Sequence, residues 1–124
     1  MAGTIVITTL SDGTNSTSAT NCIRGSAKAW VNFSGLMPII RDSYNVSSIT
    51  KGSTGVYTVT FTTAMPNAQY AAIVGTVGDS SPYNQPLINS TGSYLAGSVA
   101  VFNSPDYSLM AADSPLMTVA VFSS

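Results

Sequence analysis

The sequence contains no histidine, no glutamate and only one cysteine, Cys22. Without histidine, neither a Ser-His-Asp triad nor a Cys-His pair can supply the general base that nucleophilic catalysis needs. A zinc site is disfavoured because zinc binds mainly to His and Cys side chains, and one cysteine cannot close an intrachain disulfide. We therefore expect no enzymatic activity, no cofactor and no bound metal.

Charge is also scarce, at 7% of the 124 residues, against about 25% in a typical soluble domain. No basic stripe is present to neutralise phosphates, so we expect no nucleic-acid binding. No apolar run approaches the roughly 20 residues that cross a bilayer, and the start of the chain lacks the features of a secretory signal. We therefore expect synthesis in a cytoplasm and no membrane insertion. A surface with so little charge repels its own copies weakly, which favours an oligomer over a monomer.

The five acidic side chains, all aspartates, are scattered along the chain. Asp12-Gly13-Thr14-Asn15 has the spacing of half a calcium loop, but no second acid follows nearby, so a simple turn is favoured. Asp79 and Asp106 lie in two polar segments and could form the carboxylate pair of a glycoside hydrolase. Aspartates in loops more often shape turns, which makes an enzyme acting on surface glycan the least favoured alternative.

Short segments rich in β-branched and aromatic residues recur between turn residues along the chain. They predict strands at 4–10, 27–33, 42–50, 56–64, 70–77, 94–102 and 116–122. The strands at 42–50 and 56–64 should form a hairpin around Lys51–Gly55, and Pro38 places any strand at 36–41 on an edge. In the first of these strands Tyr44 and Val46 should be packed, and in the second one face should carry Tyr57, Val59 and Phe61. Loops are expected at 11–21, 78–93 and 103–115, and no segment has a helical period over three turns. The pattern predicts an all-β fold, an antiparallel β-sandwich or barrel-like domain.

The segment at 27–33 contains the only tryptophan, Trp30. Alternation along a strand places three apolar side chains on one face and three other side chains on the opposite face: Ala29, Val31 and Phe33 against Lys28, Trp30 and Asn32. Trp30 could be an exposed platform for stacking on a sugar or base, but its apolar neighbours favour packing in the core or at a subunit contact. Burial of this second face would require polar partners, which another subunit can supply. Lys28, Trp30 and Asn32 are therefore candidate residues of a subunit interface.

The two long polar segments at 78–93 and 103–115 combine tyrosine with Ser, Gly and Asn, a composition that suits adaptable recognition surfaces. An equally favoured alternative is that their tyrosines pack the loops onto the domain. The candidate recognition residues are Asp79, Tyr83, Asn84, Asn89, Asp106 and Tyr107.

Three motifs occur in order along the first part of the chain: KAWVNF at 28–33, IRDSYNVSSIT at 40–50 and YTVTFTTAMPNAQY at 57–70. This run resembles a module that recurs in tail-fibre proteins of tailed bacteriophages. The opening TIVITTLSDGTNSTSATNCIRGSAKAWVNFSG also resembles segments that lead into the module, so the resemblance covers roughly residues 1–75.

The resemblance implies an all-β structural protein of the virion that assembles as a homotrimer and has no catalytic residues. Residues 1–27 would form an N-terminal strand and an extended arm that attaches to other phage tail or virion proteins, and 28–124 the β-sandwich domain. Its loops would bind a glycan or protein on the host cell surface. Since the sequence has no shaft, we expect a short tail fibre or receptor-binding subunit, made in the host cytoplasm and placed in the tail. The alternative is a capsid decoration or tail-assembly protein with the same fold and no receptor role.

Overall fold

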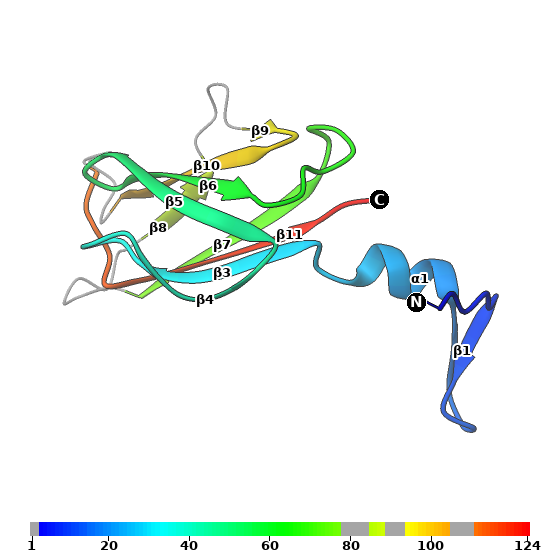
Figure 1. Ribbon diagram of the computed structural model, residues 1–124. Coiled ribbons are helices and arrows are strands. Elements are labelled where there is room, and N and C mark those ends of the chain that lie inside the picture. Colours follow the sequence, from blue (N-terminus) through cyan, green and yellow to red (C-terminus); the bar gives the residue numbers. More distant parts are fainter. Residues whose placement is uncertain (1–2, 78–84, 89–93, 105–110) are drawn as a thin grey trace.

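The computed structural model describes residues 3–77, 85–88, 94–104 and 111–124. Of the described residues, 55% are in strands and 7% in a helix. The strands pair in antiparallel sheets, which confirms the all-β class. Two sheets pack face to face as a β-sandwich around one hydrophobic core (Figure 1). One sheet has the order β5-β6-β10-β8, with β9 also paired to β10, and the other has the order β4-β3-β11-β7.

The described elements follow one another from the N-terminus to the C-terminus. They are β1 (Thr9–Ser11), β2 (Ser16–Ser18), α1 (Ala19–Gly25), β3 (Ala29–Ser34), β4 (Ile39–Tyr44), β5 (Val46–Ser53), β6 (Val56–Phe61), β7 (Ala71–Val77), β8 (Gln85–Ile88), β9 (Tyr94–Leu95), β10 (Ser98–Ser104) and β11 (Leu116–Phe122).

The core forms between the inner faces of the two sheets, where alternate residues of the central strands are buried. These residues are Ala29, Val31 and Phe33 on β3, Tyr57, Val59 and Phe61 on β6, Val99 and Val101 on β10, and Met117, Val119 and Val121 on β11. The alternation predicted for β3 and β6 is therefore confirmed. Phe33 and Tyr57 meet edge to face across the two sheets, with ring centroids 5.4 Å apart. Each large apolar side chain buried in this way contributes about 1.5–3 kcal/mol to folding.

The predicted hairpin around Lys51–Gly55 is confirmed by the pairing of β5 with β6. The strand predicted over 42–50 is wrong in one respect, because it breaks at Asn45. This residue has a φ of 55°, a conformation that Asn tolerates better than most residues. Its amide donates to the carbonyls of Lys28 and Thr63 at 3.0 and 3.1 Å, and its Oδ1 accepts from the Thr63 N–H at 2.7 Å. Asn45 is thus the corner at which the chain leaves one sheet for the other.

Other boundaries also differ from the sequence prediction. The strand expected at 4–10 is reduced to β1, and the loop expected at 11–21 contains β2 and the start of α1. A helix of seven residues is too short to show the three turns of periodicity that would have revealed it. The segment 94–102 is divided between β9 and β10, and β8 lies inside the predicted loop 78–93. β8 pairs with β10 alone, and such an edge position tolerates its proline.

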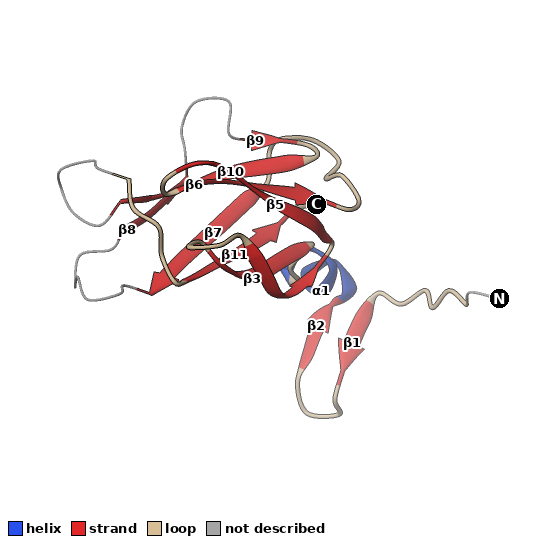
Figure 2. Cartoon of the chain, turned by 60° about the vertical axis from the view of Figure 1, so that its left-hand side comes forward, coloured by secondary structure: helices blue, strands red, loops and turns tan. Residues whose placement is uncertain are grey.

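β1, β2 and α1 lie to one side of the sandwich in both views (Figures 1 and 2). None of residues 3–26 is buried. α1 begins after Ser18, whose hydroxyl accepts a hydrogen bond from the Asn21 N–H at 3.1 Å. Within the described part of the chain, no helix has the length and apolar character needed to cross a membrane.

Gly55 ends the β5–β6 turn in a conformation with a φ of 68°, which residues with a side chain rarely adopt. A Cβ at Gly55 would lie 2.7 Å from the Asn103 carbonyl oxygen and from the Ala112 nitrogen. Gly55→Ala should therefore lower the free energy of unfolding by about 2 kcal/mol or more, measured by urea denaturation. The matched control is Gly52→Ala in the same hairpin, where the nearest atom would be 3.9 Å away. Equal urea midpoints for the two variants would contradict the conclusion that Gly55 cannot accept a side chain.

Candidate interaction surfaces

The sheet β4-β3-β11-β7 buries one face in the core and presents the other outward. Strand register places Trp30 opposite Tyr44 on β4 and Ala120 on β11, and Ala120 opposite Ile73 on β7. Residues directly opposite share a face, so these four side chains form one row across all four strands. Trp30, Tyr44 and Ile73 are 38%, 58% and 63% exposed. We call the surface around this row the outer face.

Two further rows lie on the outer face. One contains Asp42, Asn32, Thr118 and Gly75, and the other is made of two pairs, Ile39 with Ser34 and Leu116 with Val77. Antiparallel sheets with one solvated face normally carry polar residues there. Here five large apolar side chains are exposed on one face instead: Trp30, Ile39, Tyr44, Ile73 and Val77. An apolar patch of this kind is typical of an interaction site.

A shallow hollow of about 410 Å³ lies in the middle of the outer face, lined by Trp30, Ile73, Gly75 and Thr118 among others. Gly75 keeps the hollow open, because a Cβ there would come within 2.6 Å of the Thr118 hydroxyl oxygen. Beside it, Oδ1 of Asn32 is buried without a hydrogen-bond partner. Burying an amide oxygen in this way is costly unless a partner is added. The hollow therefore offers apolar contact, and the Asn32 oxygen beside it is closed off from solvent.

The structure places the three candidate interface residues differently. Trp30 and Asn32 lie together on the outer face, and Trp30 takes no part in the core. The ammonium of Lys28 instead donates to the Ile23 carbonyl and the Ser26 hydroxyl of its own chain. Sequence reasoning missed the partners of Trp30 on the other strands. Tyr44 was expected to be packed, and its exposure of 58% contradicts that prediction.

A second candidate surface lies at the opposite end of the sandwich from α1. The residues that border the segments 78–84 and 105–110 are all at this end: Val77, Gln85 and Ser104. Val77 pairs with Leu116, and Gln85 pairs with Ser104. The turn between β5 and β6 is at the same end. α1 precedes β3 at the other end, where Ala29 pairs with Val121. The two ends of the domain therefore carry different parts of the chain.

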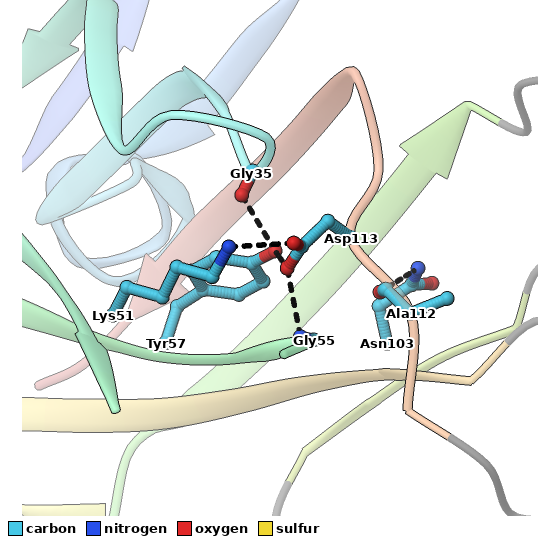
Figure 3. A network of polar contacts seen from close by, with 7 residues as sticks. All are labelled: Gly35, Lys51, Gly55, Tyr57, Asn103, Ala112 and Asp113. Atoms are coloured by element: carbon cyan, nitrogen blue, oxygen red, sulfur yellow. Dashed lines mark hydrogen bonds and ion pairs between the residues drawn. The ribbon is translucent and has the colours of Figure 1, made fainter. Parts of the chain in front are cut away.

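A network of polar contacts centred on Asp113 lies at this second surface (Figure 3). The Asp113 carboxylate forms an ion pair with the Lys51 ammonium at 2.5 Å and accepts hydrogen bonds from the Gly55 N–H at 2.8 Å and the Tyr57 hydroxyl at 2.5 Å. The Tyr57 hydroxyl also lies 2.8 Å from the Gly35 carbonyl oxygen. The network thus connects the β5–β6 hairpin, the end of β3 and the chain that enters β11.

Protonation within the network follows from burial and hydrogen bonding. Burial raises the pKa of Asp113, but hydrogen bonds from Lys51, Tyr57 and Gly55 outweigh it, so the pKa falls below its ordinary value. Burial raises the pKa of Tyr57, and the neighbouring Asp113 carboxylate raises it further. Asp113 is therefore ionised and Tyr57 protonated near neutral pH.

Residues 112–114 form hydrogen bonds with β10 of one sheet and β7 of the other. The Asn103 side-chain amide donates to the Ala112 carbonyl at 2.8 Å, and the Ala112 N–H donates to the Asn103 carbonyl at 3.1 Å. The Ser114 hydroxyl donates to the Val77 carbonyl at 2.6 Å and lies 2.7 Å from the Thr76 hydroxyl. Val77, which borders 78–84, and Asn103, one residue before the border of 105–110, are therefore both held by hydrogen bonds to one short segment. This segment lies within the loop predicted at 103–115.

The candidate recognition residues Asp79, Tyr83, Asn84, Asn89, Asp106 and Tyr107 lie outside the described residues, so both their recognition role and the Asp79–Asp106 pair stay predictions. Asp12 forms the expected turn, in which its Oδ1 accepts from the N–H groups of Thr14 at 2.9 Å and Asn15 at 2.7 Å. Among the described residues, no three His, Cys, Asp or Glu side chains gather in a group able to hold a metal ion.

Comparisons of the chain with known proteins found no matching family model, no matching curated protein and no matching solved structure. The tail-fibre resemblance therefore rests on the sequence motifs alone.

Asp113→Asn should lower the free energy of unfolding at pH 7 by about 2 kcal/mol, because it removes the ion pair and weakens two hydrogen bonds. The folded-state pKa of Asp113 is below its unfolded value of about 3.9. Its contribution is therefore present above about pH 4 and is lost as the pH falls through the folded-state value. Urea denaturation between pH 2 and 7 measures both effects.

The control for this prediction is Asp42→Asn, which changes an exposed aspartate on the edge strand β4. It should change the free energy of unfolding by less than about 0.5 kcal/mol at pH 7. A difference between wild type and Asp113→Asn that is the same at pH 3 and pH 7 would argue against the ionised network.

Proposed function

We propose that this chain is a structural protein of a tailed-bacteriophage virion, a short tail-fibre or receptor-binding subunit that assembles as a homotrimer and attaches the particle to the host surface. The ordered motifs at 28–33, 40–50 and 57–70 support the class of protein. The proposed role is binding and not catalysis, in agreement with a sequence that has no histidine and no glutamate.

The observation that carries the proposal is that the two ends of the domain carry different parts of the chain. None of residues 3–26 is buried, and β2 and α1 in particular are available at one end to a virion partner. At the other end, residues 112–114 fix the chain that borders 78–84 and 105–110. Recognition residues are commonly carried on loops that a rigid scaffold positions. The arrangement suits a protein that is attached at one end and contacts a glycan or protein receptor at the other.

The outer face supports the oligomeric part of the proposal. Five large apolar side chains are exposed to water on one sheet, and their burial by another subunit would be favourable. Asp42 is the one charged residue in the three rows of the described outer face, so little charge must be desolvated when another subunit covers it. A homotrimer would use this face for contact between copies.

The first test locates the protein on the phage particle by immunogold electron microscopy, with antibodies against the purified chain. We expect gold particles on the tail. Labelling of capsid faces would select the alternative, a decoration protein with no receptor role. Labelling of neither structure would reject both, because each requires the chain in the finished virion.

The second test measures binding of the fluorescent protein to host cells. Replacement of Tyr83 and Tyr107 by alanine should reduce binding by at least about tenfold, which corresponds to about 1.4 kcal/mol. The native mass from light scattering should stay near three times 12.8 kDa. Ser48→Ala, an exposed change on β5, is the control and should bind like the wild type. Undiminished binding by the double variant would contradict the assignment of the recognition end.

A further inference from the structure

We propose that residues 4–10 of one copy pack on the outer face of a neighbouring copy, so that the subunits exchange their N-terminal segments. The inference rests on the proposed self-association and adds to it the segment that completes each interface. It follows from two apolar surfaces that the same chain leaves uncovered.

The first uncovered surface is the N-terminal segment itself. Ile5 and Val6 are 86% and 90% exposed, and Ile7 and Leu10 are about half exposed. In an extended chain, Ile5 and Ile7 point to one side and Val6 and Leu10 to the other. Apolar side chains on both sides of a strand are typical of strands that are covered on both sides. The residues therefore suit a buried strand, although their own chain does not bury them.

The local structure around this segment offers little stability of its own. β1 and β2 have three residues each, and α1 has seven residues with no buried side chain. An isolated hairpin is marginally stable at best in water, and a helix well short of about 12 residues gains little from propensity. An apolar segment with such weak support gains most from a surface supplied by another molecule.

The contacts between the end of α1 and the start of β3 direct the N-terminal segment away from the outer face of its own chain. The Lys28 ammonium binds the Ile23 carbonyl and the Ser26 hydroxyl at the end of α1, and the Ser26 N–H donates to the Cys22 carbonyl at 3.2 Å. α1 and the hairpin then lie beyond the end of the sandwich (Figures 1 and 2). The segment is thus presented to a neighbour and not to its own sheet.

The areas involved favour an interface that includes both surfaces. Four strands about 4.8 Å apart and about six residues long give the outer face on the order of 400 Å² of flat area. A stable interface buries about 800 Å² on each partner, so contact between two outer faces alone would supply about half of this. A seven-residue extended segment covered on both sides adds on the order of 200 Å² to each copy.

Chemical character favours the same match. Residues 4–10 carry no charge, and the hollow between Trp30 and Ile73 is suited to a branched apolar side chain. The bare backbone of residues 3–7 also has N–H and C=O groups that are free of strand pairing.

The test is disulfide trapping between differently tagged copies in the Cys22→Ser background, which removes the native thiol. One chain carries Val6→Cys and the other carries Ile73→Cys, and the two are refolded together and oxidised. We expect a disulfide-linked product that contains both tags, formed at least about tenfold faster than with Ser48→Cys, which is exposed on the other sheet. Ile5→Cys replaces Val6→Cys in a parallel experiment, because the two positions sample both sides of the segment.

The outcomes separate this inference from the proposed function. A trimer by light scattering with cross-linking no faster than the Ser48→Cys control, from both positions 5 and 6, would overturn the exchange and leave the trimer standing. A monomer at every concentration without cross-linking would overturn both. Rapid cross-linking in a protein that fails to bind host cells would support the exchange and contradict the receptor role.

A second readout does not depend on engineered thiols. Val6→Asp should raise the concentration for half-dissociation of the wild-type assembly by about tenfold or more, since a carboxylate would have to be buried in the partner's apolar face. Thr14→Asp, in the exposed turn between β1 and β2, is the control and should leave that concentration unchanged. Equal dissociation of the two variants would contradict the exchange.

Discussion

The end of the sandwich opposite α1 depends on one carboxylate, Asp113. It lies where the two sheets meet, and it draws a lysine, a tyrosine hydroxyl and a backbone N–H from one sheet toward the chain that enters the other. Its tyrosine partner also contacts Phe33 across the core. This ion pair is only partly buried, since the Lys51 and Asp113 side chains keep 28% and 20% exposure. The apolar core gives the domain its cohesion, and Asp113 fixes how the two layers are joined at this end.

The asymmetry between the two sheets has a simple physical origin. β5 and β6 carry Ser and Thr on their outward positions, which water can solvate. β3, β4 and β7 carry Trp30, Ile39, Tyr44, Ile73 and Val77 outward, which water solvates poorly. The sheet β4-β3-β11-β7 is apolar on both faces, and a monomer buries only the face that packs against the other sheet. The outer face, the unsupported N-terminal segment and the scarcity of charge are consistent with one another if the chain acts as part of an assembly.

Much of the sandwich could be predicted because its signals are local. The alternation of side chains along each strand identified the inner faces of β3 and β6. Two glycines marked the turn between β5 and β6. The corner at Asn45 could not be predicted, since an asparagine with a positive φ is fixed by its hydrogen bonds to Lys28 and Thr63, which are distant in sequence. The outer face was equally hidden. Trp30 was identified, but its row with Tyr44, Ala120 and Ile73 depends on strand register across three pairings.

The hydrogen bonds between Asn103 and Ala112 hold two points of the chain together in the manner of a clasp. Whatever sequence joins them, its ends are set by the scaffold, and the remaining cost of a longer connection is mainly the entropy of closing it. That cost grows by only about 0.6 kcal/mol for each doubling of length. The position is therefore one where the chain can exchange or extend its sequence while the sandwich keeps its stability. A lineage that had to change its binding specificity repeatedly could do so here without redesigning its core.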